Sequence, residues 1–281
     1  MAEQMQPLVT TEWLAKELGA LDLVVFDATK YLPNEGKDGA TLFAERHIPG
    51  ARFFDIDVVA DLDTSLPHMA PTPGRFEKLM RMMSVDNESR VVFYDQKGIS
   101  SSARGWWLMG LFGHDRAAVL DGGLPKWLSE QRPTEAGVAP DAAPTSFTAT
   151  FRATRLRGIG DMLTVDPGRV VLDARPAGRF TGAVPEPRPG LPSGHMPGSR
   201  NLPSTSLVSA DGTLLPPDRL RALLAEAGVD GSKPVVTSCG TGVTATILSL
   251  GMVQAGLPIG AVYDGSWTEW AGRPNTIKET N

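Results

Sequence analysis

Cysteine is almost absent from the sequence, since Cys239 is the only one among 281 residues. One cysteine cannot form an internal disulfide, and it excludes cysteine-rich zinc sites, so we expect a reducing, cytoplasmic setting and no bound metal. The most apolar stretch, residues 246–262, is interrupted by Gln254 and Pro258 and is too short and polar to span a bilayer. The first seven residues lack the basic and apolar segments of a secretory signal, so none is expected.

Positive charge is also scarce. The chain has 27 Lys and Arg against 32 Asp and Glu, a net charge of −5, and no basic run. Nucleic acids and acidic membrane surfaces are bound through clustered basic side chains, so the sequence predicts neither as a partner. The length is typical of two domains of ordinary size.

The chain repeats itself. The motif His-Ile-Pro-Gly at His47 recurs as His-Met-Pro-Gly at His195, 148 residues later. Four landmarks recur in the same order: residues 23–28 at 170–174, 47–51 at 195–199, 91–95 at 235–239, and 121–127 at 264–270. Ordered matches with nearly constant spacing indicate a duplicated domain. The segment 131–152, rich in Pro, Ala and Thr, is typical of a linker between domains at 1–130 and 153–281.

Strand-like and helix-like segments alternate within each copy. Short β-branched runs at 23–26, 91–94, 170–172 and 235–237 are typical of buried parallel strands. Residues 73–83 and 217–227 show helical patterning, and Gly228 follows the second segment where a C-cap glycine belongs. This alternation predicts an α/β fold in which each domain is a parallel sheet flanked by helices.

Cys239 lies between a strand-like run and a helix expected to begin near Val243 or Thr244, with a glycine-rich loop in between. Open parallel sheets bind their ligands at this carboxyl edge. Glycines let successive backbone N–H groups converge on an anion, and the helix N-terminus adds partial positive charge. These effects favour a thiolate, so we predict that Cys239 is a nucleophile rather than a small buried apolar side chain. Asp95 stands at the matching position of the first copy, which therefore offers no sulfur nucleophile.

Three chemistries use such a cysteine. Cysteine phosphatases need an arginine six positions after the nucleophile, where this chain has Ala245. Acyl transfer needs a histidine base, and His195, the nearest in sequence, has a repeat partner in His47 that indicates a shared structural turn. The remaining chemistry is sulfur transfer, in which the thiolate becomes a persulfide that the loop amides stabilise as an anion. It requires no metal and no cofactor.

From about Trp13 to Trp270 the chain resembles the tandem-rhodanese sulfurtransferases, and its loop at 239–245 resembles their 3-mercaptopyruvate branch. The motifs that carry the resemblance are residues 46–51, 53–57, 178–180, 186–188 and 264–267, together with that loop. The resemblance implies two tandem rhodanese-like domains, an inactive first one and a catalytic cysteine in the second. The family pattern has serine where this chain has Thr241, so the hydroxyl is kept and a methyl group is added.

The resemblance also implies substrate-binding residues. Arg179 and Arg188 correspond to ligands of the donor carboxylate, which the planar guanidinium can bind in a bidentate manner. The loop around the sulfur comprises Gly240, Thr241, Gly242, Val243 and Thr244. Thiosulfate is a compact dianion that favours cations beside the transferred sulfur, whereas 3-mercaptopyruvate carries its one carboxylate further away. The neutral loop favours the second donor.

In the family, a hydroxyl at the position of Thr241 has been proposed to join a proton relay with a histidine and an aspartate of the first domain. The matching positions here are His47 and Asp38. The alternative for His47 is a structural turn histidine, like its repeat partner His195.

We therefore expect a sulfurtransferase that moves sulfur from 3-mercaptopyruvate through a cysteine persulfide to a thiol, such as thioredoxin or a small thiol, or to cyanide, and releases pyruvate. Two alternatives stay open: a thiosulfate:cyanide sulfurtransferase and a non-catalytic rhodanese-type module that senses sulfur.

Overall fold

The computed structural model describes residues 5–138, 143–164 and 166–280. Residues 1–4 of the expected first domain, and residues 139–142 of the expected linker with Pro140 among them, lie outside the described residues. Within the described ranges no helix combines the length and the apolar character needed to cross a membrane.

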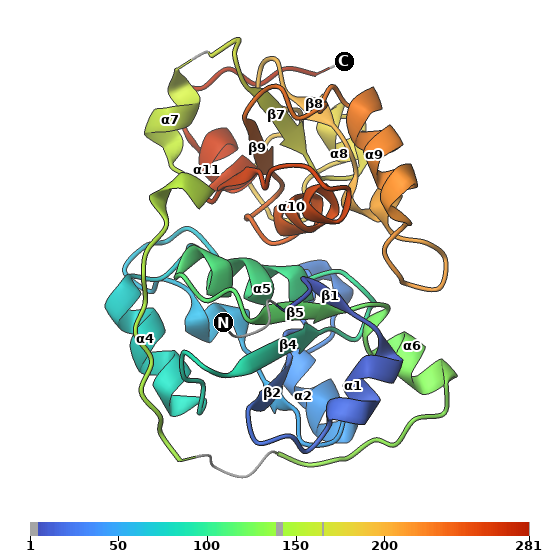
Figure 1. The fold of residues 1–281 in the computed structure, drawn as a ribbon. Coiled ribbons are helices and arrows are strands. Elements are labelled where there is room, and N and C mark those ends of the chain that lie inside the picture. The colour runs from blue at the N-terminus through green and yellow to red at the C-terminus, as the bar shows by residue number, and fades with distance from the viewer. Residues whose placement is uncertain (1–4, 139–142, 165, 281) are drawn as a thin grey trace.

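Two five-stranded parallel sheets form the framework (Figure 1). The first has the strand order β1-β5-β4-β2-β3, and the second has the equivalent order β6-β10-β9-β7-β8. The strands are β1 (Leu8–Val9), β2 (Leu23–Asp27), β3 (Arg52–Phe53), β4 (Arg90–Tyr94), β5 (Ala117–Leu120), β6 (Leu156–Arg157), β7 (Val170–Asp173), β8 (Arg200–Asn201), β9 (Val235–Ser238) and β10 (Ala261–Tyr263). The predicted duplication and the α/β class are confirmed.

Helices cover both faces of each sheet. In the first unit they are α1 (Thr11–Glu17), α2 (Gly39–Glu45), α3 (Ile56–Val59), α4 (Pro73–Met82), α5 (Ser102–Leu111) and α6 (Gly123–Ser129). In the second unit they are α7 (Ile159–Leu163), α8 (Ala177–Phe180), α9 (Pro217–Glu226), α10 (Ala245–Gln254) and α11 (Ser266–Gly272). The helices expected at 73–83 and 217–227 correspond to α4 and α9.

The two units pack against each other through α5 and α10, which lie between the two sheets (Figure 1). Every residue of α5 is buried, and α10 is apolar on all sides and buried over most of its length. Trp107 and Leu108 of α5 belong to the same apolar core as Ile247 and Leu250 of α10. Because α5 follows β4 and α10 follows β9, this packing brings the loops after both strands to the boundary between the units.

The connection between the units lies along the first unit. Phe147 is fully buried there beside Phe76, and the Thr150 N–H donates to the Phe112 carbonyl at 2.8 Å. The second sheet begins at β6, close after this segment.

Candidate active site

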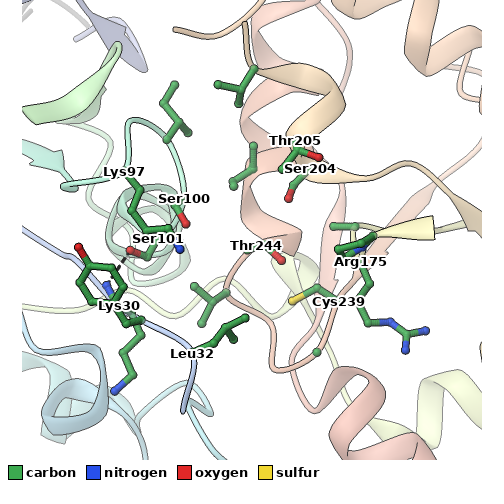
Figure 2. Close-up of a pocket in the computed structure, with 18 of the residues that line it drawn as sticks. Lys30, Leu32, Lys97, Ser100, Ser101, Arg175, Ser204, Thr205, Cys239 and Thr244 are labelled. Carbon is green, nitrogen blue, oxygen red and sulfur yellow. Dashed lines mark hydrogen bonds between the residues drawn. The ribbon is translucent and has the colours of Figure 1, made fainter. Parts of the chain in front are cut away.

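Cys239 lies directly after β9, at the carboxyl edge of the second sheet, and α10 begins at Ala245. Its side chain is only 2% exposed, and its sulfur faces a cavity of about 550 Å³ that residues of both units line (Figure 2). Lys97, Ser100 and Ser101 of the first unit lie on the opposite side of this cavity. The predicted strand, cysteine, loop and helix arrangement is therefore present, and the sulfur is directed into a space that can hold a small molecule.

Hydrogen bonds from neighbouring segments fix the backbone of the cysteine loop. The Cys239 N–H donates to Ser266 Oγ at 3.1 Å, and the Gly240 carbonyl accepts from both the N–H and the hydroxyl of Thr268 at 3.0 and 2.7 Å. Gly242 has a φ of +76°, and a Cβ there would lie 2.8 Å from the Asp264 carbonyl oxygen, so only glycine fits.

The backbone N–H groups of residues 240–244 donate to no oxygen within the described part of the protein. They follow Cys239 immediately and lead into the N-terminus of α10, where amides and the helix dipole favour negative charge. The loop thus has unused donors next to a sulfur that becomes an anion in sulfur transfer.

The first unit shows what the equivalent loop binds. Asp95 occupies the position of Cys239, and its fully buried carboxylate accepts four backbone N–H groups at 2.8–3.0 Å, those of Lys97, Ser100, Ser101 and Ser102. One copy of the loop therefore already holds an anion, supplied by its own side chain. This internal comparison supports the interpretation of the second loop as an anion cradle.

The structure brings Arg179 and Arg188 to the wall of the cavity that contains Cys239. Arg179 is held by an ion pair with Glu186, whose side chain is 2% exposed. Arg188 is half-buried, and no hydrogen bond or ion pair engages its guanidinium within the described residues. Burial lowers the pKa of Arg188, and the nearby Arg179 acts in the same direction. Asp57 and Glu186 oppose this shift from a distance, and an arginine keeps its charge in such surroundings, so the guanidinium of Arg188 is available to an anionic ligand.

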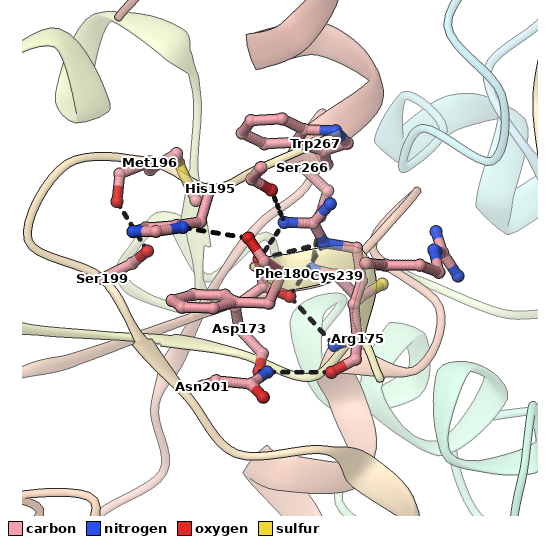
Figure 3. A network of polar contacts seen from close by, with 12 residues as sticks. Asp173, Arg175, Phe180, His195, Met196, Ser199, Asn201, Cys239, Ser266 and Trp267 are labelled. Carbon is pink, nitrogen blue, oxygen red and sulfur yellow. Dashed lines mark hydrogen bonds and ion pairs between the residues drawn. The ribbon is translucent and has the colours of Figure 1, made fainter. Parts of the chain in front are cut away.

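Sequence reasoning left Arg175 unassigned, and the structure gives it a supporting place in this wall (Figure 3). Arg175 is 1% exposed, pairs with Asp173 and with Glu186 at 2.8 Å, and its guanidinium lies 4.4 Å from the Trp267 ring centroid. Glu186 therefore accepts from both Arg175 and Arg179, which fixes the orientation of Arg179. The motif Glu186-Pro187-Arg188 was recognised in the sequence, but the role of its glutamate was missed.

The prediction that His47 and Asp38 lie beside Thr241 is wrong in its placement. His47 Nδ1 bonds to the Phe43 carbonyl at 2.8 Å, and its ring stacks on that phenylalanine at 4.1 Å. His195 makes the equivalent contacts with Phe180 at 3.0 and 3.9 Å, so both histidines fix the same turn in the two copies. Asp38 is exposed and caps α2 by accepting the Thr41 N–H at 2.8 Å.

The structure places His68 and Asp57 beside Thr241 instead. His68 Nδ1 lies 2.8 Å from Thr241 Oγ1, and His68 Nε2 lies 2.9 Å from Asp57 Oδ1. A carboxylate only accepts, so Nε2–H donates to Asp57, and in the neutral imidazole Nδ1 accepts from the Thr241 hydroxyl. Lys30 forms an ion pair with the other oxygen of Asp57.

Thr241, His68 and Asp57 form a hydrogen-bonded triad, and its contacts set the protonation states of His68 and Asp57. The hydrogen bond from His68, together with Lys30, holds the pKa of Asp57 well below its usual value of 3.8. Burial lowers the pKa of His68 from its usual 6.5, while Asp57 opposes that shift. The histidine is therefore neutral at pH 7, with a lone pair directed at the Thr241 hydroxyl.

His68 was missed because it belongs to a loop of the first unit, between α3 and α4, that none of the four repeat landmarks includes. One signal was available. Of the four histidines, His47 and His195 match each other across the repeat, which leaves His68 and His114 without a structural explanation.

Three comparisons place these features among known proteins. A family profile described as "Rhodanese-like domain" matches residues 10–130 and 161–273. The chain is 41% identical over 271 residues to the 3-mercaptopyruvate sulfurtransferase of Rattus norvegicus, covering 94% of this chain and 91% of that protein. It is 38% identical over 292 residues to thiosulfate/3-mercaptopyruvate sulfurtransferase 1, mitochondrial, of Arabidopsis thaliana, covering 96% and 77%. Among solved structures, the 3-mercaptopyruvate sulfotransferase SseA from Escherichia coli matches with a TM-score of 0.84 and 33% identity, covering 94% of this chain and 99% of that one.

Proposed function

Since the chain belongs to the rhodanese family and consists of two tandem rhodanese-like units, we propose that it is a 3-mercaptopyruvate sulfurtransferase. The observation that carries this proposal is the cysteine at the mouth of an uncharged amide cradle, with Arg179 and Arg188 on the wall of the same cavity. The same cavity therefore offers a sulfur nucleophile and two cations suited to the carboxylate of an α-keto acid.

In the first half-reaction the Cys239 thiolate attacks the sulfur of 3-mercaptopyruvate. A sulfur–sulfur bond forms, the carbon–sulfur bond breaks, and its electron pair moves into the carbonyl to give the enolate of pyruvate. A proton added to the methylene carbon completes pyruvate and leaves the outer sulfur on Cys239 as a persulfide. The unused amides of residues 240–244 stabilise the sulfur anions at both ends of this step.

We assign to Arg179 and Arg188 the role of orienting 3-mercaptopyruvate in the cavity. Arg188 makes no ion pair within the described residues, so its guanidinium is available to form a bidentate pair with the donor carboxylate. Arg179, held by Glu186, lines the same wall and keeps a fixed position. A carboxylate bound there leaves the carbonyl and the sulfur of the donor to extend toward Cys239.

The triad of Thr241, His68 and Asp57 acts on the carbonyl group of 3-mercaptopyruvate. As the persulfide forms, the thiol proton of the donor is released and taken up at His68 Nδ1, and Asp57 stabilises the resulting imidazolium. Nδ1–H then donates to Thr241 Oγ1, so the Thr241 hydroxyl is free to donate to the developing enolate oxygen. The proton held by His68 then passes to the methylene carbon, which converts the enolate to pyruvate and returns the imidazole to its neutral form. This role replaces the relay through His47 and Asp38 that sequence reasoning proposed.

In the second half-reaction an acceptor thiolate attacks the outer sulfur of the persulfide and regenerates the Cys239 thiolate. The acceptor can be a small thiol, a thiol of thioredoxin, or cyanide, since each is a nucleophile that can attack this sulfur. We assign the reaction to the cytoplasm, because a single buried cysteine suits a reducing compartment.

Thiosulfate is a second candidate donor, and it occurs in the printed name of the Arabidopsis relative. The loop argues against it as the preferred donor, since residues 240–244 contain no cation to balance a compact dianion. A module that only senses sulfur would form the persulfide without turning over.

The deciding experiment measures pyruvate release from 3-mercaptopyruvate by the wild type and by Cys239→Ser, with cyanide as acceptor, alongside thiocyanate formation from thiosulfate. We expect the wild type to prefer 3-mercaptopyruvate and the variant to be inactive with both donors. Undiminished activity of Cys239→Ser refutes the mechanism, and a clear preference for thiosulfate reverses the donor assignment. Mass spectrometry identifies the sensor alternative as a stable adduct of about 32 Da, one sulfur atom, without turnover.

A further inference from the structure

A buried ion pair crosses the boundary between the two units behind the active site. Arg104 lies on α5 of the first unit, is 1% exposed, and has its guanidinium centre 4.6 Å from the Trp107 ring centroid. Its Nη2 lies 2.7 Å from Oδ1 of Asp264, a 2% exposed residue that follows β10 in the second unit. Neither residue lines the cavity in front of Cys239.

This pair contacts the backbone on both sides of the active site. Arg104 Nη2 donates to the His68 carbonyl at 2.6 Å, and Nη1 donates to the Gly242 carbonyl at 3.2 Å. Asp264 Oδ2 accepts the Ala70 N–H at 2.6 Å. The segment that carries His68 and the loop that carries Thr241 are therefore both bound to one Arg–Asp unit.

The backbone of His68 needs such support. Its φ is +63°, in the left-handed region that residues with a side chain rarely adopt. A residue persists in that conformation only when its surroundings hold it there. The two hydrogen bonds at the His68 carbonyl and the Ala70 N–H supply that constraint, because they fix the peptide groups that follow the strained residue.

We propose that Arg104 and Asp264 are positioning residues that hold His68 against Thr241, so that the triad is complete only while the two units are docked. This inference rests on the proposed function for the role of the triad. The pair acts through His68 and through Gly242 and touches no substrate. A buried pair of this kind provides geometric specificity, and removing one partner leaves a charge unpaired.

Two variants test the proposal. Arg104→Lys keeps the positive charge but cannot bridge Asp264, His68 and Gly242 with one planar group, and Asp264→Asn keeps an acceptor for Ala70 while losing the charge. Asp121→Asn is the matched control, because the Asp121 carboxylate also crosses the boundary, accepting the Leu214 N–H at 2.8 Å, but contacts no member of the triad. Circular dichroism verifies that each variant is folded.

The first readout is steady-state kinetics with 3-mercaptopyruvate. We expect Arg104→Lys and Asp264→Asn each to lower kcat roughly tenfold with KM changed less than about threefold, as for a loss of positioning in the reacting complex. In a His68→Gln background the same changes lower kcat less than about twofold further, because the group they position is already gone. Asp121→Asn leaves kcat unchanged in both backgrounds.

The second readout does not depend on activity. With four histidines in the chain, NMR titration resolves His68, which faces Asp57, Lys30 and Arg188. We expect the lowered pKa of His68 to move toward 6.5 in both variants and to stay unchanged in Asp121→Asn. If the wild type releases no pyruvate while this titration responds as stated, the proposed function fails and the positioning role stands. The positioning role is overturned if Arg104→Lys and Asp264→Asn lower kcat as much in the His68→Gln background as in the wild type. It is also overturned if the pKa of His68 is unchanged in the folded single variants.

Discussion

The Thr241 hydroxyl in the second unit donates a hydrogen bond of 2.8 Å to Nδ1 of His68 in the first unit, across 173 positions of sequence. The nucleophile and its anion cradle belong to one repeat, whereas the imidazole and the aspartate behind it belong to the other. The first repeat has no cysteine at the matching position, but it supplies a wall of the cavity and two members of the triad.

We expect Thr241→Val to lower kcat for 3-mercaptopyruvate by roughly 100-fold, the size of a typical acid–base contribution. Valine matches threonine in shape but offers no hydroxyl to His68 or to the substrate. Thr241→Ser is the control and should keep most of the rate. Equal rates for the valine and serine variants would remove the hydroxyl from the mechanism. Steady-state pyruvate release measures both.

Arg188→Lys should raise KM for 3-mercaptopyruvate roughly tenfold, because a point charge replaces a bidentate fork at the carboxylate. Arg200→Lys is the matched control, since Arg200 is exposed on β8 and, among the residues that the structure describes, its guanidinium bonds to the Ala227 carbonyl alone, at 3.1 Å. If neither KM nor kcat changes in Arg188→Lys, this arginine does not bind the donor.

Asp95→Asn should lower the free energy of unfolding by roughly 2–4 kcal/mol, because a buried carboxylate that accepts four N–H groups is replaced by an amide with one acceptor oxygen. Denaturant titration measures the loss. The kcat of the folded variant should be nearly unchanged, since Asp95 is not in the lining of the cavity. An unaltered midpoint of unfolding would show that the loop of the first unit does not need a negatively charged acceptor.

The protein should lose stability as the pH falls below about 6.5, and His114 should account for part of that loss. His114 is 3% exposed, and burial lowers its pKa from 6.5. The unfolded chain takes up the proton near 6.5 while the folded protein resists it, so the contribution is complete above that pH and declines below it, down to the folded pKa. His68 contributes with the same sign.

Denaturant unfolding at a series of pH values from 8 to 5 measures this dependence in the wild type and in His114→Asn, roughly across the range where histidine titrates. The variant should show a shallower loss of stability over the acid half of the range. Parallel curves for the two proteins would assign the pH dependence to other groups.

Repeat matching recovered most of the framework from the sequence. The strand and helix alternation predicted the two sheets and their loops. The alignment of Asp95 with Cys239 predicted which of the two copies carries the nucleophile. The assignment of Arg179 and Arg188 came from the resemblance of their motifs to the tandem-rhodanese sulfurtransferases, and the structure places both arginines on the cavity wall.

The same reasoning failed at the triad for a physical reason. His47 lies in a repeated motif, and repetition marks what both copies need, which here is a turn held by a stacked histidine. The residue with the chemical role, His68, lies in a loop outside the repeated motifs, and the packing of the two units through α5 and α10 brings it to Thr241. No spacing or periodicity along the chain encodes that contact.

The shared core of α5 and α10 also limits how the protein can be divided. A fragment that begins after the linker would contain Cys239 and the amides of its loop but would lack His68. Its helix α10, which is mostly apolar and buried against α5, would be exposed to water. We expect such a fragment to aggregate, so any engineered version of this protein has to retain the first unit.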